Sequence, residues 1–122
     1  MTLSPADLAA VEAAWEIEIE TRAASDAPVH STIIWAVTDG PDAFVRSVNG
    51  SRARWYREAV AHPAVVVRIG DQRIPALAVT AVDPESVART SRAFERKYAG
   101  DPDMTAMVEP HTLATTLRLE PD

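Results

Sequence analysis

Four arginines lie within twelve consecutive positions of a chain whose formal net charge is -6 at neutral pH. Arg46, Arg52, Arg54 and Arg57 flank and follow the turn signal Asn49-Gly50. Guanidinium groups recognise phosphates and carboxylates through paired, charge-assisted hydrogen bonds. This spacing therefore favours an anion-binding site built around one short loop.

The element after the loop is predicted to be a helix from Ser51 to Ala61, ended by His62-Pro63. With Ser51 as its N-terminal cap, Arg52 and Arg54 would stand in a first turn that already carries partial positive charge. Each cation there costs about 0.3 kcal/mol or more. A bound phosphate would offset that cost, because it accepts hydrogen bonds from the free backbone N–H groups. The residues predicted to hold it are Arg46, Ser47, Asn49, Gly50, Ser51, Arg52, Arg54 and Tyr56.

Two members of this set have their own expected roles. Gly50 is expected to let the backbone approach the ligand closely. Tyr56 is expected either to reach the ring or the phosphate of the ligand or to be a half-buried structural residue. The alternative for the arginines is a set of ion pairs with carboxylates of residues 16–20 or of Asp39 and Asp42.

Other reactive residue types form no recognisable set. The chain has no cysteine, and its three histidines lack metal-ligand spacing. The serines near the arginines have no visible histidine partner, which argues against nucleophilic catalysis. No catalytic residue and no metal site are therefore predicted. Core packing is the preferred interpretation of Trp35 and Trp55, with a pocket-lining role as the alternative for Trp35.

Periodicity identifies the elements that must position the loop. In WEIEIETR, Trp15 to Arg22, apolar and charged side chains alternate, as in a half-buried antiparallel strand. Before it, Ser4-Pro5 predicts a helix start, with Asp7 closing the cap and Leu3 and Leu8 forming a hydrophobic staple.

The rest of the chain reads as short strands and one longer helix. Strands are predicted at Ser31–Thr38, Ala43–Ser47, 64–70, 73–82 and 114–121, and a helix at Asp83–Tyr98, closed by Gly100. Pro75 indicates an edge or a bulge in its strand, and the basic residues 89–97 of the helix are expected at the surface. The absence of βαβ alternation favours a six-stranded antiparallel, barrel-like sheet with helices at its flanks.

Length and composition limit the number of domains and the class of protein. A chain of 122 residues fits one domain, residues 1–122. Its isoelectric point near 5.0 argues against nucleic-acid binding. No apolar run approaches a membrane span, and the start lacks the features of a signal peptide, so a cytoplasmic protein is expected.

A resemblance adds to this interpretation. The run from Glu18 to Gly70 resembles the small split β-barrel proteins that bind FMN or the deazaflavin coenzyme, and the deazaflavin-dependent nitroreductases in particular. The similar segments are Thr21-Arg22 with Ser25, then IIWAV, RSVNGS, WYREAVAHP and VVVRIG. The whole chain, including MVEPHTLATTLRL, also looks like a family of small uncharacterised bacterial proteins of that fold.

The resemblance implies an α+β split β-barrel of the FMN-binding type, with FMN or a deazaflavin coenzyme as cofactor and a homodimer as the assembly. It implies an oxidoreductase in which the cofactor carries the hydride chemistry, so that no side-chain catalytic set is required. Residues 22–26 lack the glycine and basic groups usual in the family's turn, which favours an alternative, a non-catalytic protein that binds a cofactor or another anion. A third hypothesis is an interaction domain whose arginines contact a partner's carboxylates.

Overall fold

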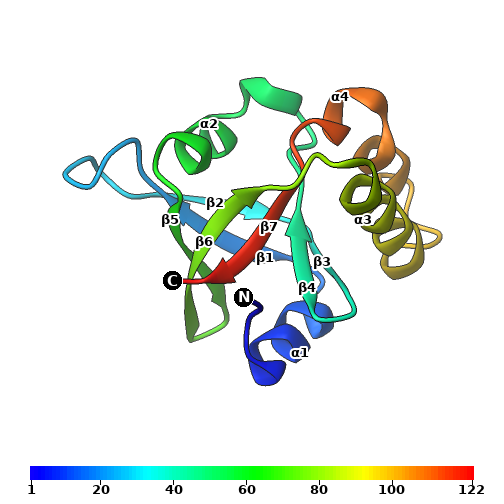
Figure 1. Cartoon of the computed structure of the whole chain (residues 1–122), viewed down its shortest axis with the longest axis horizontal. Coiled ribbons are helices and arrows are strands. Elements are labelled where there is room, and N and C mark those ends of the chain that lie inside the picture. Colours follow the sequence, from blue (N-terminus) through cyan, green and yellow to red (C-terminus); the bar gives the residue numbers. More distant parts are fainter.

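A computed structural model describes residues 1–122 as one curled antiparallel sheet with helices at its ends and side (Figure 1). The strands are β1 (Ile17–Thr21), β2 (His30–Ile34), β3 (Ala36–Asp39), β4 (Asp42–Val45), β5 (Ala64–Ile69), β6 (Gln72–Thr80) and β7 (Leu117–Pro121). The helices are α1 (Pro5–Ala13), η1 (Gly50–Arg52), α2 (Arg54–Ala61), α3 (Pro84–Lys97), η2 (Met104–Val108) and α4 (Pro110–Leu113). The predicted split β-barrel class is confirmed.

The sheet has seven strands, one more than predicted, because the strand expected at Ser31–Thr38 breaks at Trp35. The strand order is β2-β1-β5-β6-β7-β4-β3, so the two outermost strands follow one another in the chain. A single residue, Trp35, thus passes from one edge of the sheet to the other. The sheet closes on itself through this kink, as a barrel does.

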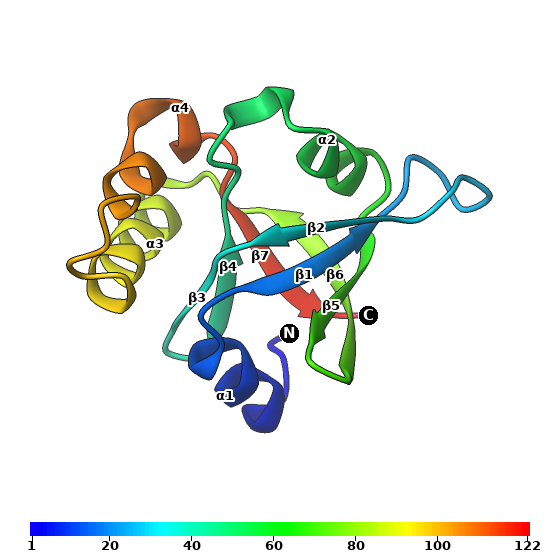
Figure 2. The same cartoon turned by 180° about the vertical axis from the view of Figure 1, so that it is seen from behind.

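The first helix and strand form as their sequence predicts. The Ser4 side chain accepts a hydrogen bond from the Asp7 backbone N–H at 3.1 Å, and Pro5 opens the helix. In β1 the alternate residues Ile17, Ile19 and Thr21 are buried, which confirms the period-two interpretation. Figures 1 and 2 show α1 at one end of the barrel and α2 at the other.

Pro75 lies in β6, between β5 and β7 in the sheet. Its strand partner is Val66 of β5, while the pairing with β7 begins one residue later, at Ala76 opposite Pro121. The side that lacks an N–H therefore faces no partner strand. The strand is central, but it behaves as an edge at this one position, as the proline requires.

The buried residues form two clusters. The larger fills the barrel interior and includes Ile19, Val67 and Leu119. The smaller joins β3 and β4 to α3 and η2 through Phe44, Phe94, Tyr98, Val37, Ala81, Ala93 and Met107. Burying one such aromatic side chain contributes about 1.5–3 kcal/mol. The second cluster therefore fixes α3 and η2 on the side of the barrel next to the Trp35 kink.

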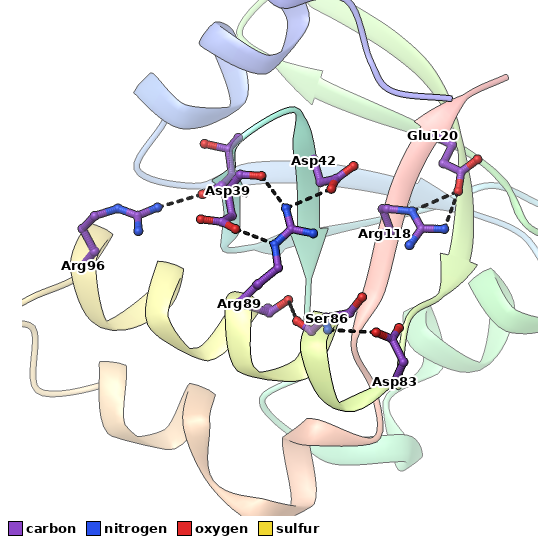
Figure 3. A network of polar contacts seen from close by, with 10 residues as sticks. Asp39, Asp42, Asp83, Ser86, Arg89, Arg96, Arg118 and Glu120 are labelled. Atoms are coloured by element: carbon purple, nitrogen blue, oxygen red, sulfur yellow. Dashed lines mark hydrogen bonds and ion pairs between the residues drawn. The ribbon is translucent and has the colours of Figure 1, made fainter.

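Helix α3 begins where predicted, with the Asp83 side chain accepting from the Ser86 N–H at 3.0 Å. Its basic residues are not all at the surface, which corrects the expectation. Arg89 donates from Nε to Asp39 Oδ2 at 2.6 Å and from Nη2 to Asp42 Oδ2 at 2.9 Å (Figure 3). These hydrogen bonds, that to Asp39 foremost, raise the pKa of Arg89. The clamp ties α3 to the turn between β3 and β4.

None of the helices has the length and apolarity needed to cross a membrane.

Candidate functional site

A cleft of about 400 Å³ lies where the Trp35 kink meets the segment after β4. Its walls come from β2, from α2, from η2 and from the loop that precedes η1. The lining residues are Glu16, Thr32, Ile33, Ile34, Trp35, Arg46, Val48, Asn49, Trp55, Asp103, Ala106 and Met107. Size and mixed apolar and polar lining fall within the range of small-molecule sites.

An aromatic cluster fixes one wall of the cleft. The ring of Trp35 stacks on Tyr98 with centroids 3.8 Å apart and planes 5° from parallel, while Trp15 meets both rings edge-on. The Tyr98 hydroxyl donates to the Trp15 carbonyl at 2.7 Å, and burial raises the pKa of Tyr98. Trp35 is therefore both a packed residue and a cleft residue, and Trp55, which also lines the cleft, is buried, as expected.

Arg46 is buried beside the cleft and has no carboxylate partner. It is 1% exposed, and all its hydrogen-bond acceptors are neutral. They are Thr116 Oγ1 at 2.8 Å, Ser91 Oγ at 2.9 Å, the Val87 carbonyl at 2.8 Å and the Met107 carbonyl at 3.2 Å. Burial lowers the pKa of Arg46 to about 10, so the group stays charged at neutral pH. The wall of the cleft thus contains a positive charge without a counter-ion.

Ser47 follows Arg46 and is equally buried. Its backbone N–H donates to Thr115 Oγ1 at 3.0 Å, but its own hydroxyl has no hydrogen-bond partner. A buried hydroxyl without a partner is uncommon and costs roughly 1–3 kcal/mol. Ser47 does not line the cleft, so the structure does not bring this hydroxyl to the site expected for an anion.

The loop beyond Ser47 differs from the sequence expectation in its helix start. Ser51 is not the N-terminal cap, because residues 50–52 form the short turn η1 and α2 begins only at Arg54, after Ala53. Ala53 has no side-chain acceptor, which leaves the first N–H groups of α2 without a side-chain cap. Arg52 and Arg54 are exposed there.

Gly50 has φ +73°, and a side chain there would meet His111 O at 3.4 Å. The side of Gly50 that lacks a Cβ therefore faces α4. A ligand can approach the Gly50 backbone closely only from another side. Tyr56 is half-buried, and its hydroxyl donates to the Ala114 carbonyl at 3.4 Å. Of the eight predicted site residues, Arg46 and Asn49 line the cleft, whereas Ser51, Arg52 and Arg54 are exposed beyond it.

Four of the carboxylates proposed as alternative partners are occupied elsewhere, whereas Glu16 lines the cleft. Glu18 and Glu20 contact Arg68 and Arg73 from β5 and β6, and Asp39 and Asp42 contact Arg89. No ion pair in the structure includes an arginine of residues 46–57. These arginines therefore form no ion pair within the chain, although the nearby charge of Arg54 contributes to the lowered pKa of Glu58.

A buried carboxylate that sequence reasoning missed lies on the inner face of α2. Glu58 accepts from Thr21 Oγ1 at 2.9 Å and contacts His30 Nδ1 at 3.0 Å. Burial raises the pKa of Glu58, but the hydrogen bonds from His30 and Thr21 outweigh it and leave that pKa below its ordinary value. The spacing of Glu58 from Trp55, three residues on, was the available signal, because it places both on one helix face.

Comparison with known proteins gives a family and a fold. The sequence matches, over residues 7–119, the family described as "Uncharacterized protein conserved in bacteria (DUF2255)". No curated protein sequence matches the chain.

Several solved structures share the fold at low sequence identity. The heme storage protein HutZ from Vibrio cholerae has a TM-score of 0.71 and 15% identity, covering 100% of this chain and 92% of that one. An F420-H2 dependent reductase (FDR-A) has a TM-score of 0.66 and 16% identity, with 87% and 94% covered. The conserved hypothetical protein Rv2991 from Mycobacterium tuberculosis has a TM-score of 0.68 and 15% identity, with 98% and 79% covered.

Proposed function

Because this chain belongs to the DUF2255 family of bacterial proteins and folds as a split β-barrel, we propose that it binds a flavin-type cofactor, FMN or a deazaflavin coenzyme, in the cleft. The planar ring lies between the walls that contain Trp35 and Trp55. The phosphate lies toward Asn49, Arg52 and Arg54. If the protein is an enzyme, it is an oxidoreductase. An F420-H2 dependent reductase of the same fold supports this class of cofactor.

The observation that carries the proposal is the buried charge of Arg46. Removing one charge from water without a counter-ion costs several kcal/mol, which neutral acceptors offset only in part. An anionic ligand in the adjoining cleft would supply the missing negative charge. The unpartnered hydroxyl of Ser47, the next residue in the chain, is a second unsatisfied group, although Ser47 does not line the cleft.

The outer arginines suit the phosphate end of such a ligand. Asn49 lines the cleft, and the chain continues from it through η1 to Arg54 at the start of α2. Arg52 and Arg54 are exposed and form no ion pair, so both guanidinium groups are available. The uncapped N-terminus of α2 adds N–H donors in the same region.

The chain's own residues bind, orient and enclose the cofactor rather than react. The cofactor, once bound, supplies hydride transfer. Trp35 and Met107 provide apolar walls that exclude water from one side of the ring. Two carboxylates, Glu16 and Asp103, also line the cleft and disfavour a second anionic group beside them.

A second candidate function, a non-catalytic cofactor- or anion-binding protein, is favoured by residues 22–26. Arg22 donates from Nη1 to the Ser25 carbonyl at 2.9 Å, within its own loop. Both residues line a separate hollow with His62 and do not reach the cleft. This loop therefore adds no cation to the cleft, which weakens the binding of a long phosphate-bearing tail.

We also propose a homodimer formed around the cleft. Ile33 is 61% exposed and Val48 44%, and both line it, while Trp15 is 53% exposed and contacts Trp35. Apolar side chains gathered in this way mark an interaction surface. Light scattering on Ile33→Glu should report a monomer, with Val60→Glu, an exposed apolar residue of α2 outside the cleft, remaining dimeric.

Titration tests the cofactor directly. The purified protein should be examined for visible absorption and then titrated separately with FMN and the deazaflavin coenzyme, following fluorescence. Saturable binding of either supports the proposal, and no spectral change with both contradicts it. Reoxidation of the bound, reduced cofactor by added acceptors, faster than in solution, would distinguish the oxidoreductase from the non-catalytic binding protein.

A further inference from the structure

Four consecutive residues line the cleft, Thr32 to Ile34 of β2 and Trp35 at the kink that ends this strand. Successive side chains of a strand point to opposite faces of the sheet. Side chains alone would therefore place only every second residue against a cleft on one face. A cleft that touches all four must meet the strand from its side, where the backbone itself is exposed.

The outer side of β2 has no partner in the structure. β2 pairs only with β1, with Ile33 opposite Glu18 and Thr32 opposite Ile19. No backbone hydrogen bond outside the helices and strands includes residues 30–35. In an antiparallel pair, every second residue directs both its N–H and its C=O away from the neighbouring strand. The cleft is thus bordered by a row of free donors and acceptors.

The remaining walls suit a flat ring. Trp35 is held in a fixed orientation by its stack on Tyr98, 3.8 Å away, and Trp55 of α2 is only 5% exposed. Rings prefer the faces and edges of other aromatic rings as neighbours. A planar ligand between these walls would turn one of its edges toward the free side of β2.

We propose that the outer edge of β2 hydrogen-bonds the edge of a planar heteroaromatic ring in which carbonyl and N–H groups alternate, as in a pyrimidinedione. One strand residue offers an N–H and a C=O side by side, and a cyclic imide offers the complementary C=O and N–H. This inference rests on the proposed function and deepens it. It assigns the choice of ring to backbone groups and favours flavin-type rings over porphyrins, whose outer edges carry no N–H.

Ligand analogues test the pairing without any change to the protein. Riboflavin and N3-methylriboflavin differ in the one imide N–H, and both fluoresce. Fluorescence titration should give an affinity about tenfold weaker for the methylated compound, since one hydrogen bond is lost and a strand carbonyl is left unpaired. Equal affinities would overturn the edge pairing and leave the proposed function intact. Absence of riboflavin binding by a protein that binds FMN would overturn the edge pairing alone, and absence of binding by FMN and the deazaflavin coenzyme as well would overturn both.

Proline variants test the same edge from the protein side. Thr32→Pro and Ile33→Pro are matched, because neighbouring residues direct their N–H groups to opposite sides and only one of the two faces the cleft. The variant at the outward position should keep its melting temperature and bind riboflavin about tenfold more weakly. N3-methylriboflavin should bind this variant about tenfold more weakly again, because proline removes the strand N–H but keeps the carbonyl that accepts from the imide. The inward variant should lose melting temperature, because its N–H bonds β1.

Two further results would overturn the inference. One is a folded outward-position variant that binds riboflavin as tightly as the unmodified protein. The other is riboflavin binding that weakens as the protein concentration rises, which would show that a second copy of the chain pairs with β2 and excludes the ring.

Discussion

Replacement of Glu58 by alanine should destabilise the protein by about 2 kcal/mol at neutral pH. The Thr21 hydroxyl is 1% exposed and would lose its only acceptor, which costs roughly 1–3 kcal/mol. His30 is more accessible, so water can replace its contact, and its loss adds less. For a domain of this size, about 2 kcal/mol corresponds to a melting temperature roughly 8 °C lower.

Thermal unfolding followed by circular dichroism measures this effect, with Glu95→Ala as the matched control. Glu95 is an exposed residue of α3 without a hydrogen bond or an ion pair, so its replacement should change stability by less than about 0.5 kcal/mol. Equal melting temperatures for the two variants would refute the role assigned to Glu58.

The stability difference between the unmodified protein and Glu58→Ala should depend on pH. The pKa of Glu58 is lower in the folded protein than its ordinary value of 4.5, so in the window below 4.5 the unfolded chain binds more protons. The stabilisation by Glu58 is therefore present above that value and is lost as the pH falls through the folded pKa. The difference in unfolding free energy between the unmodified protein and Glu58→Ala should therefore become smaller as the pH falls. A difference that grows on acidification would contradict the assignment.

Two other predictions concern arginines. Arg52→Ala and Arg54→Ala should each weaken FMN or deazaflavin binding at least about fivefold, with little change in the melting temperature of the free protein. Arg57→Ala removes the same charge from the exposed side of α2 and should leave binding intact. Calorimetry measures the affinities and thermal unfolding the melting temperatures; lower melting temperatures with unchanged affinities would make Arg52 and Arg54 structural. Arg89→Ala should destabilise by roughly 2 kcal/mol because it leaves Asp39 and Asp42 unpaired, while Arg92→Ala, exposed on the same helix, should have almost no effect by denaturant unfolding.

Local rules predicted the elements that local chemistry determines. The cap at Ser4, the alternation in β1 and the Asp83 start of α3 depend on neighbours within a few residues, and all three are confirmed. The cap at Ser51 was wrong, because the turn η1 displaces the helix start to Arg54. A capping residue predicts a helix only where the following backbone is free to adopt α geometry.

The parts that sequence could not predict depend on distant contacts. The run IIWAV is apolar throughout, so nothing in it marks Trp35 as the kink. The break is set by barrel closure, which requires β2 and β3 to lie at opposite edges of the sheet. The burial of Arg46 is similar, because its acceptors lie 41 to 70 residues away.

The placement of the cleft at the Trp35 kink links occupancy to the integrity of the barrel. The two outermost strands diverge from this one residue, so the cleft lies on the seam along which the barrel would open. A ligand there contacts β2 on one side of the seam and, on the other, the segment directly after the β3–β4 hairpin, so it binds only while the seam is shut. Binding therefore raises the free energy of local opening of β2 and β3 by RT ln(1 + [L]/Kd). Their amides should be the ones whose hydrogen exchange slows most when the cleft is filled.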